Sequence, residues 1–196
     1  MINDTAAFWD ERYRTQEAVP ERGPAAFLVE NLGLLPPRGD VLDIAMGSGR
    51  NALFLAARGY DVTGIDISPV AAERCREQAA RLGLHISAIC ADLTSYRLPE
   101  AAFDVILNFY YLQRDLCPRI EKMLRPGGLL VFETFTTEQR RQGWGPTQDG
   151  HLLRPGELPS LFPGLEQILY REGIAESERG KKHVAGLVAR RPDLAP

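Results

Sequence analysis

Residues 41–51 of the chain read VLDIAMGSGRN. The apolar start of this stretch predicts a buried strand, the glycines at 47 and 49 predict a tight turn, and the residues after them predict the first turn of a helix. Glycine lets the backbone pass close to a ligand, and a helix start offers unpaired N–H groups. The stretch therefore predicts a cradle for a nucleotide cofactor, although it fits a dinucleotide as well as other cofactors.

The size of the chain limits its domain organisation. With 196 residues, 44% of them hydrophobic, it can bury one full core, so we expect a single domain over residues 1–196. We expect residues 1–23 to form an N-terminal helix and loop that act as a lid, and residues 24–196 to form the core. The net charge of -3 gives no basic field, which disfavours binding to nucleic acid.

Other sequence features bear on the cellular location. The chain has no apolar run long enough to cross a bilayer and no basic leader followed by an apolar run, so we expect neither membrane insertion nor secretion. Cys75, Cys90 and Cys117 lie far apart, which fits neither a disulfide framework nor a paired metal-ligand spacing. We therefore expect a cytoplasmic protein without a bound metal, as a monomer or a homodimer.

Strand-like and helix-like segments alternate along the chain. The predicted strands are residues 41–44, 61–67, 85–90, 103–109 and 129–135, and the predicted helices are residues 6–13, 24–34, 51–58, 68–82 and 116–124. Strands separated by helices indicate a parallel sheet covered on both faces, as in a Rossmann-like three-layer α/β sandwich. Residues 166–171 and 183–190 have no helix between them and predict an antiparallel hairpin at a sheet edge.

Three carboxylates lie at the carboxyl ends of the predicted strands, where ligands bind in open parallel sheets. Asp66 ends the second strand 19 residues after Gly47 (66 minus 47), where it can accept both hydrogen bonds of a ribose diol. Asp92 ends the third strand and can accept from an exocyclic amine such as adenine N6. Asp43 would repel a pyrophosphate and suit a cationic sulfonium amino acid. Together these positions favour S-adenosylmethionine over NAD.

Further motifs point to one family. They are the turn at residues 43–49, the two carboxylates Asp66 and Asp92, and the sequence LRPGGL at residues 124–129. Through them the chain resembles the class I S-adenosylmethionine-dependent methyltransferases over about residues 8–190. The sequences FWDERY, GRNALFLA and GYDVTGID, which begin at residues 8, 49 and 59, are similar to small methyltransferases related to tellurite-resistance proteins.

The resemblance implies a seven-stranded, mostly parallel sheet with an antiparallel C-terminal strand. It also implies that a residue of the group Asn108, Phe109, Tyr110 and Tyr111, at the end of the fourth strand, lies beside the methyl group that is transferred. The chain departs from the family pattern at Ala45, which stands where the first glycine is usual. A methyl group there would narrow the pocket for the methionine portion of the cofactor.

The predicted cofactor contacts cluster at the turn and at the strand ends. Arg50 and Asn51 begin the helix beside the glycine turn, and Trp9 and Tyr13 share one helical face that we interpret as the lid. The full predicted set is Tyr13, Asp43, Ala45, Gly47, Gly49, Arg50, Asn51, Asp66, Ile67, Asp92, Leu93 and Asn108.

Three residues are candidates for catalysis. Glu133 interrupts an apolar strand, where a charge is costly unless it is paired or faces a cleft, so it is either an active-site carboxylate or a salt-bridged structural residue. His151 lies in the long irregular segment 136–154 and either faces substrate or is a solvated loop residue. Tyr110 follows the fourth strand and needs a partner for its hydroxyl if it is buried.

The predicted reaction is in-line methyl transfer from S-adenosylmethionine to a small-molecule acceptor. None of these candidates is compelling as a general base, which favours an acceptor that ionises easily, such as a thiol, a carboxylate or a metalloid oxyanion. Two alternatives remain. An NAD-dependent oxidoreductase would use the same turn and Asp66, and a non-catalytic S-adenosylmethionine-binding protein would explain Ala45 and the missing base.

Overall fold

The computed structural model describes residues 6–15 and 23–193, and its seven strands form a mixed, mostly parallel sheet. The predicted α/β class is therefore confirmed. The chain divides into two compact units, Met1–Leu98 and Pro99–Pro196. The single domain expected from the length stays a prediction, and residues 1–5 and 16–22 of the expected lid segment lie outside the described residues. No helix in the described part of the chain has the length and apolar character needed to cross a membrane.

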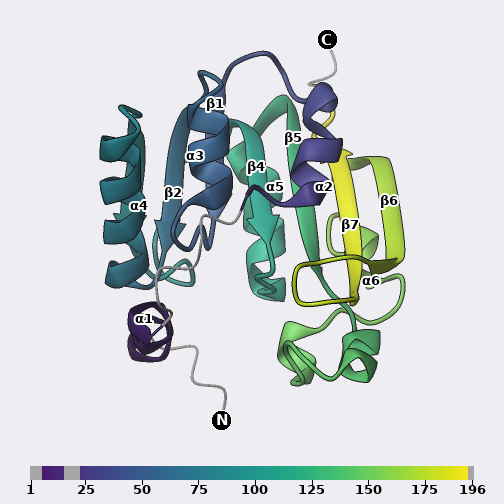
Figure 1. The fold of residues 1–196 in the computed structure, drawn as a ribbon. Coiled ribbons are helices and arrows are strands. Elements are labelled where there is room, and N and C mark those ends of the chain that lie inside the picture. Colours follow the sequence, from purple (N-terminus) through teal and green to yellow (C-terminus); the bar gives the residue numbers. More distant parts are fainter. Residues whose placement is uncertain (1–5, 16–22, 194–196) are drawn as a thin grey trace. The chain divides into compact units, whose positions relative to one another are not determined.

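The first unit is built on three parallel strands in the order β3-β2-β1. Its elements are α1 (Ala6–Thr15), α2 (Ala26–Glu30), the 3-10 helix η1 (Leu32–Leu34), β1 (Asp40–Ile44), α3 (Arg50–Ala56), β2 (Asp61–Asp66), α4 (Pro69–Arg81) and β3 (Ile86–Cys90). Figure 1 shows α1 beside the lower end of α4, and the two helices are in contact. This unit holds the glycine turn and the three carboxylates singled out above.

The cap predicted for α4 is present. The Ser68 side chain accepts a hydrogen bond from the Ala71 N–H at 3.1 Å, and Pro69 occupies the first turn, where its missing N–H leaves no bond unmade. The helix ends at Arg81, close to the predicted end. Local signals of this kind fix a helix start because they act within a single turn of backbone.

The helix predicted for residues 24–34 is wrong in its second half. The α-helix ends at Glu30, and a 3-10 turn follows over Leu32–Leu34. The Asn31 side chain donates a hydrogen bond to the Phe27 carbonyl at 2.8 Å, which satisfies an acceptor at the end of the helix. The helical spacing of apolar residues continues past Glu30 in the sequence, but the backbone changes there from an α-helix to a 3-10 turn.

The second unit contains four strands in the order β4-β5-β7-β6. Its elements are β4 (Phe103–Phe109), η2 (Arg114–Leu116), α5 (Cys117–Met123), β5 (Leu124–Phe135), η3 (Thr137–Gln142), η4 (Asp149–His151), α6 (Glu157–Ser160), β6 (Glu166–Ala175) and β7 (Lys182–Arg190). Strand β4 is parallel to β5, whereas β7 is antiparallel to both β5 and β6. The predicted terminal hairpin is thus confirmed, with both of its strands longer than expected.

Strand β5 begins five residues earlier than predicted, at Leu124 instead of Leu129. The added residues include Pro126 and two glycines, and the pairing with β4 shifts in register between Phe103 and Val105. A Cβ on Gly128 would lie 2.9 Å from the Arg125 carbonyl oxygen, so a glycine is required where the strand bends. The sequence did not predict this part of the strand, because proline and glycine are uncommon within strands.

Candidate functional site

The glycine turn connects β1 to α3 through three residues with positive φ. Ala45, Gly47 and Gly49 have φ values of 51°, 58° and 84°. The turn is held to the sheet by the Met46 N–H, which donates to the Ile65 carbonyl at 3.0 Å. A Cβ on Gly49 would lie 2.3 Å from the Cys75 sulfur on α4, so both the backbone angle and the packing require glycine there. Ala45 holds a left-handed conformation that costs an alanine about 1–2 kcal/mol.

Asp66 joins the end of β2 to this turn. Its Oδ2 accepts a hydrogen bond from the Gly47 N–H at 2.8 Å, and its Oδ1 accepts from the Ser68 N–H at 2.9 Å. Burial raises the pKa of this carboxyl, and the two backbone hydrogen bonds oppose that rise. Each carboxylate oxygen has a second lone pair, so Asp66 can hold the turn and still accept from a diol.

Asp43 lies within the first unit as a buried carboxylate, only 2% exposed. Among the described residues, no group forms a hydrogen bond with its Oδ2. Burial raises the pKa of Asp43 to about 7, and the positive charge of Arg50 opposes this rise. A buried carboxylate with an unused acceptor fits a cationic ligand and disfavours a pyrophosphate at the same place. The residues at the turn therefore fit the predicted sulfonium cofactor.

Two predicted cofactor residues make contacts within the protein. The Asn51 side-chain oxygen accepts from the Ala25 N–H at 2.9 Å, which fixes the chain before α2. Asp92 is exposed, and its Oδ1 accepts from the Thr94 N–H at 2.8 Å and from the Thr94 hydroxyl at 2.7 Å. Asp92 thus closes an Asx turn after β3. Next to the carboxylates, Leu93 is buried and Ile67 is half-buried.

Tyr13 of α1 lies beside the glycine turn. A Cβ on Gly47 would be 2.6 Å from the Tyr13 hydroxyl oxygen. Burial raises the pKa of Tyr13, and the charge of Asp66 raises it further. The Tyr13 and Trp9 rings have centroids 6.4 Å apart. The first unit therefore brings together Tyr13, the turn glycines, Asp43 and Asp66.

In the second unit, the predicted residues at the end of β4 have unusual surroundings. Asn108 is buried, and its Oδ1 has no hydrogen-bond partner among the described residues. Tyr110 follows with a φ of 62°, and its N–H donates to the Glu133 carbonyl at 2.9 Å. A positive φ at an aromatic residue costs about 1–3 kcal/mol and persists only where the surroundings enforce it.

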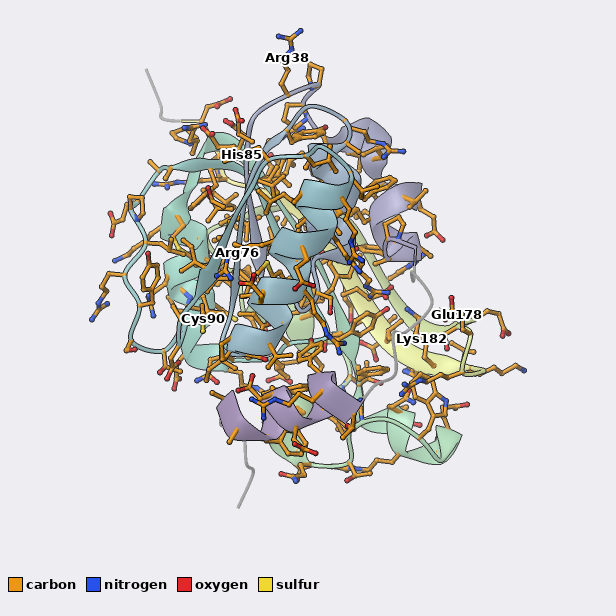
Figure 2. The ribbon with its side chains drawn as sticks, turned by 60° about the vertical axis from the view of Figure 1, so that its left-hand side comes forward. Arg38, Arg76, His85, Cys90, Glu178 and Lys182 are labelled. Atoms are coloured by element: carbon orange, nitrogen blue, oxygen red, sulfur yellow. The ribbon has the colours of Figure 1, made fainter. Side chains whose placement is uncertain are left out.

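Glu133 is fully buried and belongs to an ion pair. Its Oε1 accepts from Lys182 Nζ at 2.5 Å and from the Tyr110 hydroxyl at 2.7 Å, while Arg171 lies 3.5 Å from its Oε2. Lys182 Nζ also donates to the Tyr110 hydroxyl oxygen at 2.6 Å. Figure 2 labels Lys182 on β7. Of the two interpretations of Glu133, its contacts match the salt-bridged residue, and Lys182 neutralises its charge.

His151 ends η4 and is half-buried. The same segment borders a cavity of about 410 Å³ lined by Arg114, Thr137, Asp149, Gly150, Leu152 and Arg154. Arg114 forms a two-pronged ion pair with Glu157, from Nε to Oε1 at 2.7 Å and from Nη2 to Oε2 at 2.8 Å. This pair lowers the pKa of Glu157. The role of His151 toward a substrate stays a prediction.

Sequence reasoning missed two buried charged residues. Lys182 is separated from Glu133 by 49 residues, and Asp10 on α1 is separated from its partner Ser68 by 58 residues. For Asp10 a signal was present, because a carboxylate within FWDERY lies one helical turn before Tyr13. For Lys182 the only signal was its place directly before the last predicted strand, residues 183–190.

Comparisons with known proteins identify the family of this chain. A protein-family profile described as a methyltransferase domain matches residues 41–128. An uncharacterised methyltransferase of Mycobacterium tuberculosis is 32% identical over 164 residues, which cover 66% of this chain and 82% of the relative. A probable S-adenosyl-L-methionine-dependent methyltransferase of Haemophilus influenzae, TehB, is 33% identical over 144 residues, which cover 69% of this chain and 49% of the relative.

A solved structure shows the same fold. The N-methyltransferase NodS from Bradyrhizobium japonicum, in complex with S-adenosyl-L-homocysteine, superposes with a TM-score of 0.71 at 23% identity, covering 97% of this chain and all of NodS. The chain spans about half the length of several curated relatives that it matches, including TehB. The mycobacterial relative is covered over most of its length, and the glycine turn lies inside the matched profile. This chain therefore belongs to the class I S-adenosylmethionine-dependent methyltransferases.

Proposed function

We propose that this protein transfers a methyl group from S-adenosylmethionine to a small-molecule acceptor that ionises easily. The observation that carries the cofactor half of the proposal is the buried Asp43 carboxylate, whose Oδ2 has no hydrogen-bond partner among the described residues. Family membership supports the same conclusion. When bound, the cofactor supplies a methyl group made electrophilic by its sulfonium.

The residues of the glycine turn would hold the cofactor. Asp66 would accept from the ribose diol while it keeps Gly47 in place, and the absence of a side chain at Gly47 lets the Tyr13 hydroxyl approach the turn. Asp43 would favour the positive charge of the amino acid portion. Tyr13 would cover the turn and exclude water from it.

The contacts of Glu133 support an acceptor that needs no general base. Its carboxylate is neutralised by Lys182 and accepts a hydrogen bond from the Tyr110 hydroxyl. It is therefore poorly suited to take a proton from an amine or an alcohol. A thiolate, a carboxylate or a reduced metalloid oxyanion already carries the lone pair and the charge that attack the methyl group. Alignment of donor and acceptor then supplies most of the acceleration.

Two alternatives lose support for different reasons. An NAD-dependent oxidoreductase would leave a buried carboxylate near two phosphates, which is unfavourable. A non-catalytic S-adenosylmethionine-binding protein would share the cofactor site, and only turnover distinguishes it from an enzyme. We further infer a cytoplasmic protein, which the three free cysteines support.

The experiment is an assay for S-adenosylhomocysteine release with a panel of acceptors. The panel holds small thiols, short carboxylates, selenite and tellurite, with amines and alcohols as the classes expected to fail. With a thiol of ordinary pKa, the rate should rise about tenfold per pH unit below about pH 8, because only the thiolate attacks. Turnover with an ionised acceptor that is lost in Asp66→Ala supports the proposal. Turnover restricted to amines or alcohols would overturn the proposed acceptor class.

A further inference from the structure

Helix α1 is attached to the first unit in an unusual way. Of its ten residues, all of them described, only Asp10 is buried. A helix of this length has little stability on its own, so its position depends on what it docks against. Here the buried group is a carboxylate instead of an apolar side chain, which indicates a specific polar attachment.

The partners of Asp10 lie at the start of α4. Its Oδ1 accepts from the Ser68 hydroxyl at 2.5 Å and from the Val70 N–H at 3.4 Å. The Ser68 hydroxyl oxygen in turn accepts from the Ala71 N–H, so Asp10 is hydrogen-bonded to the residue that caps α4. A negative charge is favoured at the N-terminus of a helix. Figures 1 and 2 both show α1 against this end of α4.

This attachment determines where Tyr13 lies. Asp10 and Tyr13 are three residues apart and therefore lie on the same side of α1. With Asp10 bonded to Ser68, the Tyr13 hydroxyl reaches the glycine turn, where a Cβ on Gly47 would be 2.6 Å away. Ser68 also donates its N–H to Asp66 Oδ1, so one residue contacts both the lid helix and the carboxylate expected to bind ribose.

We propose that Asp10 is a positioning residue for the cofactor, which holds α1 on α4 so that Tyr13 closes the glycine turn and slows cofactor release. The inference rests on the proposed binding of S-adenosylmethionine by this turn. The polar part of the attachment is one carboxylate that accepts two hydrogen bonds from the start of α4, so α1 can detach without disturbing the sheet. Opening of α1 at this point is then the step that limits cofactor exchange.

The test measures the dissociation rate of S-adenosylhomocysteine by stopped-flow fluorescence. Trp9 on α1 reports the motion in a Trp144→Phe background, because the chain has 2 tryptophans. The variants are Asp10→Ala, Tyr13→Ala and the double variant, and Glu11→Gln is the matched control, which removes a charge from an exposed position of the same helix. A thermal melt of each variant identifies effects on folding.

We expect Asp10→Ala to release the ligand at least five times faster, with the control within twofold of the parent protein. If Asp10 acts through Tyr13, the double variant is no faster than the faster single variant. An unchanged rate in Asp10→Ala, or a double variant whose effect equals the product of the two single effects, would overturn the inference. A parent protein that binds neither S-adenosylmethionine nor S-adenosylhomocysteine would overturn the proposed function as well, so the two failures are distinguishable.

Discussion

Asp66 Oδ2 accepts a hydrogen bond from the backbone N–H of Gly47 at 2.8 Å, which ties the end of β2 to the turn that follows β1. The other oxygen of the same carboxylate accepts from the Ser68 N–H. A single buried side chain thus fixes two backbone segments at the carboxyl ends of neighbouring strands. The geometry of the cofactor turn depends on this residue before any ligand is bound.

Asp66→Ala should weaken both the fold and cofactor binding. The substitution leaves the Gly47 and Ser68 N–H groups without their acceptor, so we expect the free energy of unfolding to fall by about 1–3 kcal/mol. Affinity for S-adenosylhomocysteine should fall at least tenfold. Urea unfolding and calorimetric titration measure the two effects. Asp61→Ala, at an exposed position on the same strand, is the control, and equal affinities of the two variants would contradict the assignment.

Asp43→Asn should raise stability at alkaline pH. The pKa of Asp43 is about 7 in the folded protein against an ordinary value of 3.8, so its contribution to stability is fully present below about pH 4 and is lost as the pH rises through about 7. Asparagine does not ionise, and the variant should exceed the wild-type free energy of unfolding at pH 8 by up to about 4 kcal/mol. The difference should be small at pH 4. Urea unfolding at the two pH values provides the comparison.

The same carboxylate should make cofactor affinity depend on pH. A cation bound near Asp43 favours its ionised form, so binding below about pH 7 must release a proton. We expect the Kd for S-adenosylmethionine to rise as the pH falls from 8 to 6, by up to about tenfold. In Asp43→Asn the Kd should be higher than in the wild type and should not change over this pH range. A wild-type Kd that does not change between pH 6 and 8 would argue against a cation at this position.

Removing one partner of the Glu133–Lys182 pair should destabilise the protein more than removing both charges. Lys182→Met removes the closer counter-ion of a fully buried carboxylate and leaves Arg171, 3.5 Å from its Oε2, which should lower the free energy of unfolding by up to about 3–5 kcal/mol. Glu133→Gln combined with Lys182→Met removes both charges and should recover most of this loss. Lys181→Met, next to it and exposed, should have little effect. Chemical denaturation of the four proteins tests the pairing, and a harmless single variant at Lys182 would refute it.

Ala45→Gly should improve binding more than stability. The substitution relieves the positive φ of 51° at Ala45, but it also adds freedom to the unfolded chain, and the two effects should leave stability within about 1 kcal/mol of wild type. Removing the methyl group should widen the turn and lower the Kd for S-adenosylmethionine. Calorimetric titration of the variant decides the matter, and a raised Kd would show that the alanine methyl contributes to binding.

The sequence predicted best those features that depend on neighbouring residues. Strand β4 has its predicted bounds, because a nearly continuous apolar run forms it. The cap at Ser68 was recognisable from the proline that follows it. The end of α2 was missed because the Asn31 side chain ends the helix within an apolar pattern that continues. The spacing of apolar residues indicates which face of a helix is buried, but it does not indicate where an α-helix changes to a 3-10 turn.

The site was predictable as far as single positions allowed. The sequence predicted that Gly47 and Asp66 both belong to the cofactor site, and their hydrogen bond to each other appears only in the structure. The choice between an active-site and a salt-bridged Glu133 depended on Lys182, which lies on a strand 49 residues away in sequence. Contacts between distant segments depend on tertiary packing, and local patterns carry little information about them.

Calorimetric titration of the purified protein checks the claim that the glycine turn binds S-adenosylmethionine. We expect micromolar binding of S-adenosylmethionine and of S-adenosylhomocysteine, loss of both in Asp66→Ala, and no heat of binding with NAD. Binding of NAD alone would contradict the claim and would restore the oxidoreductase interpretation.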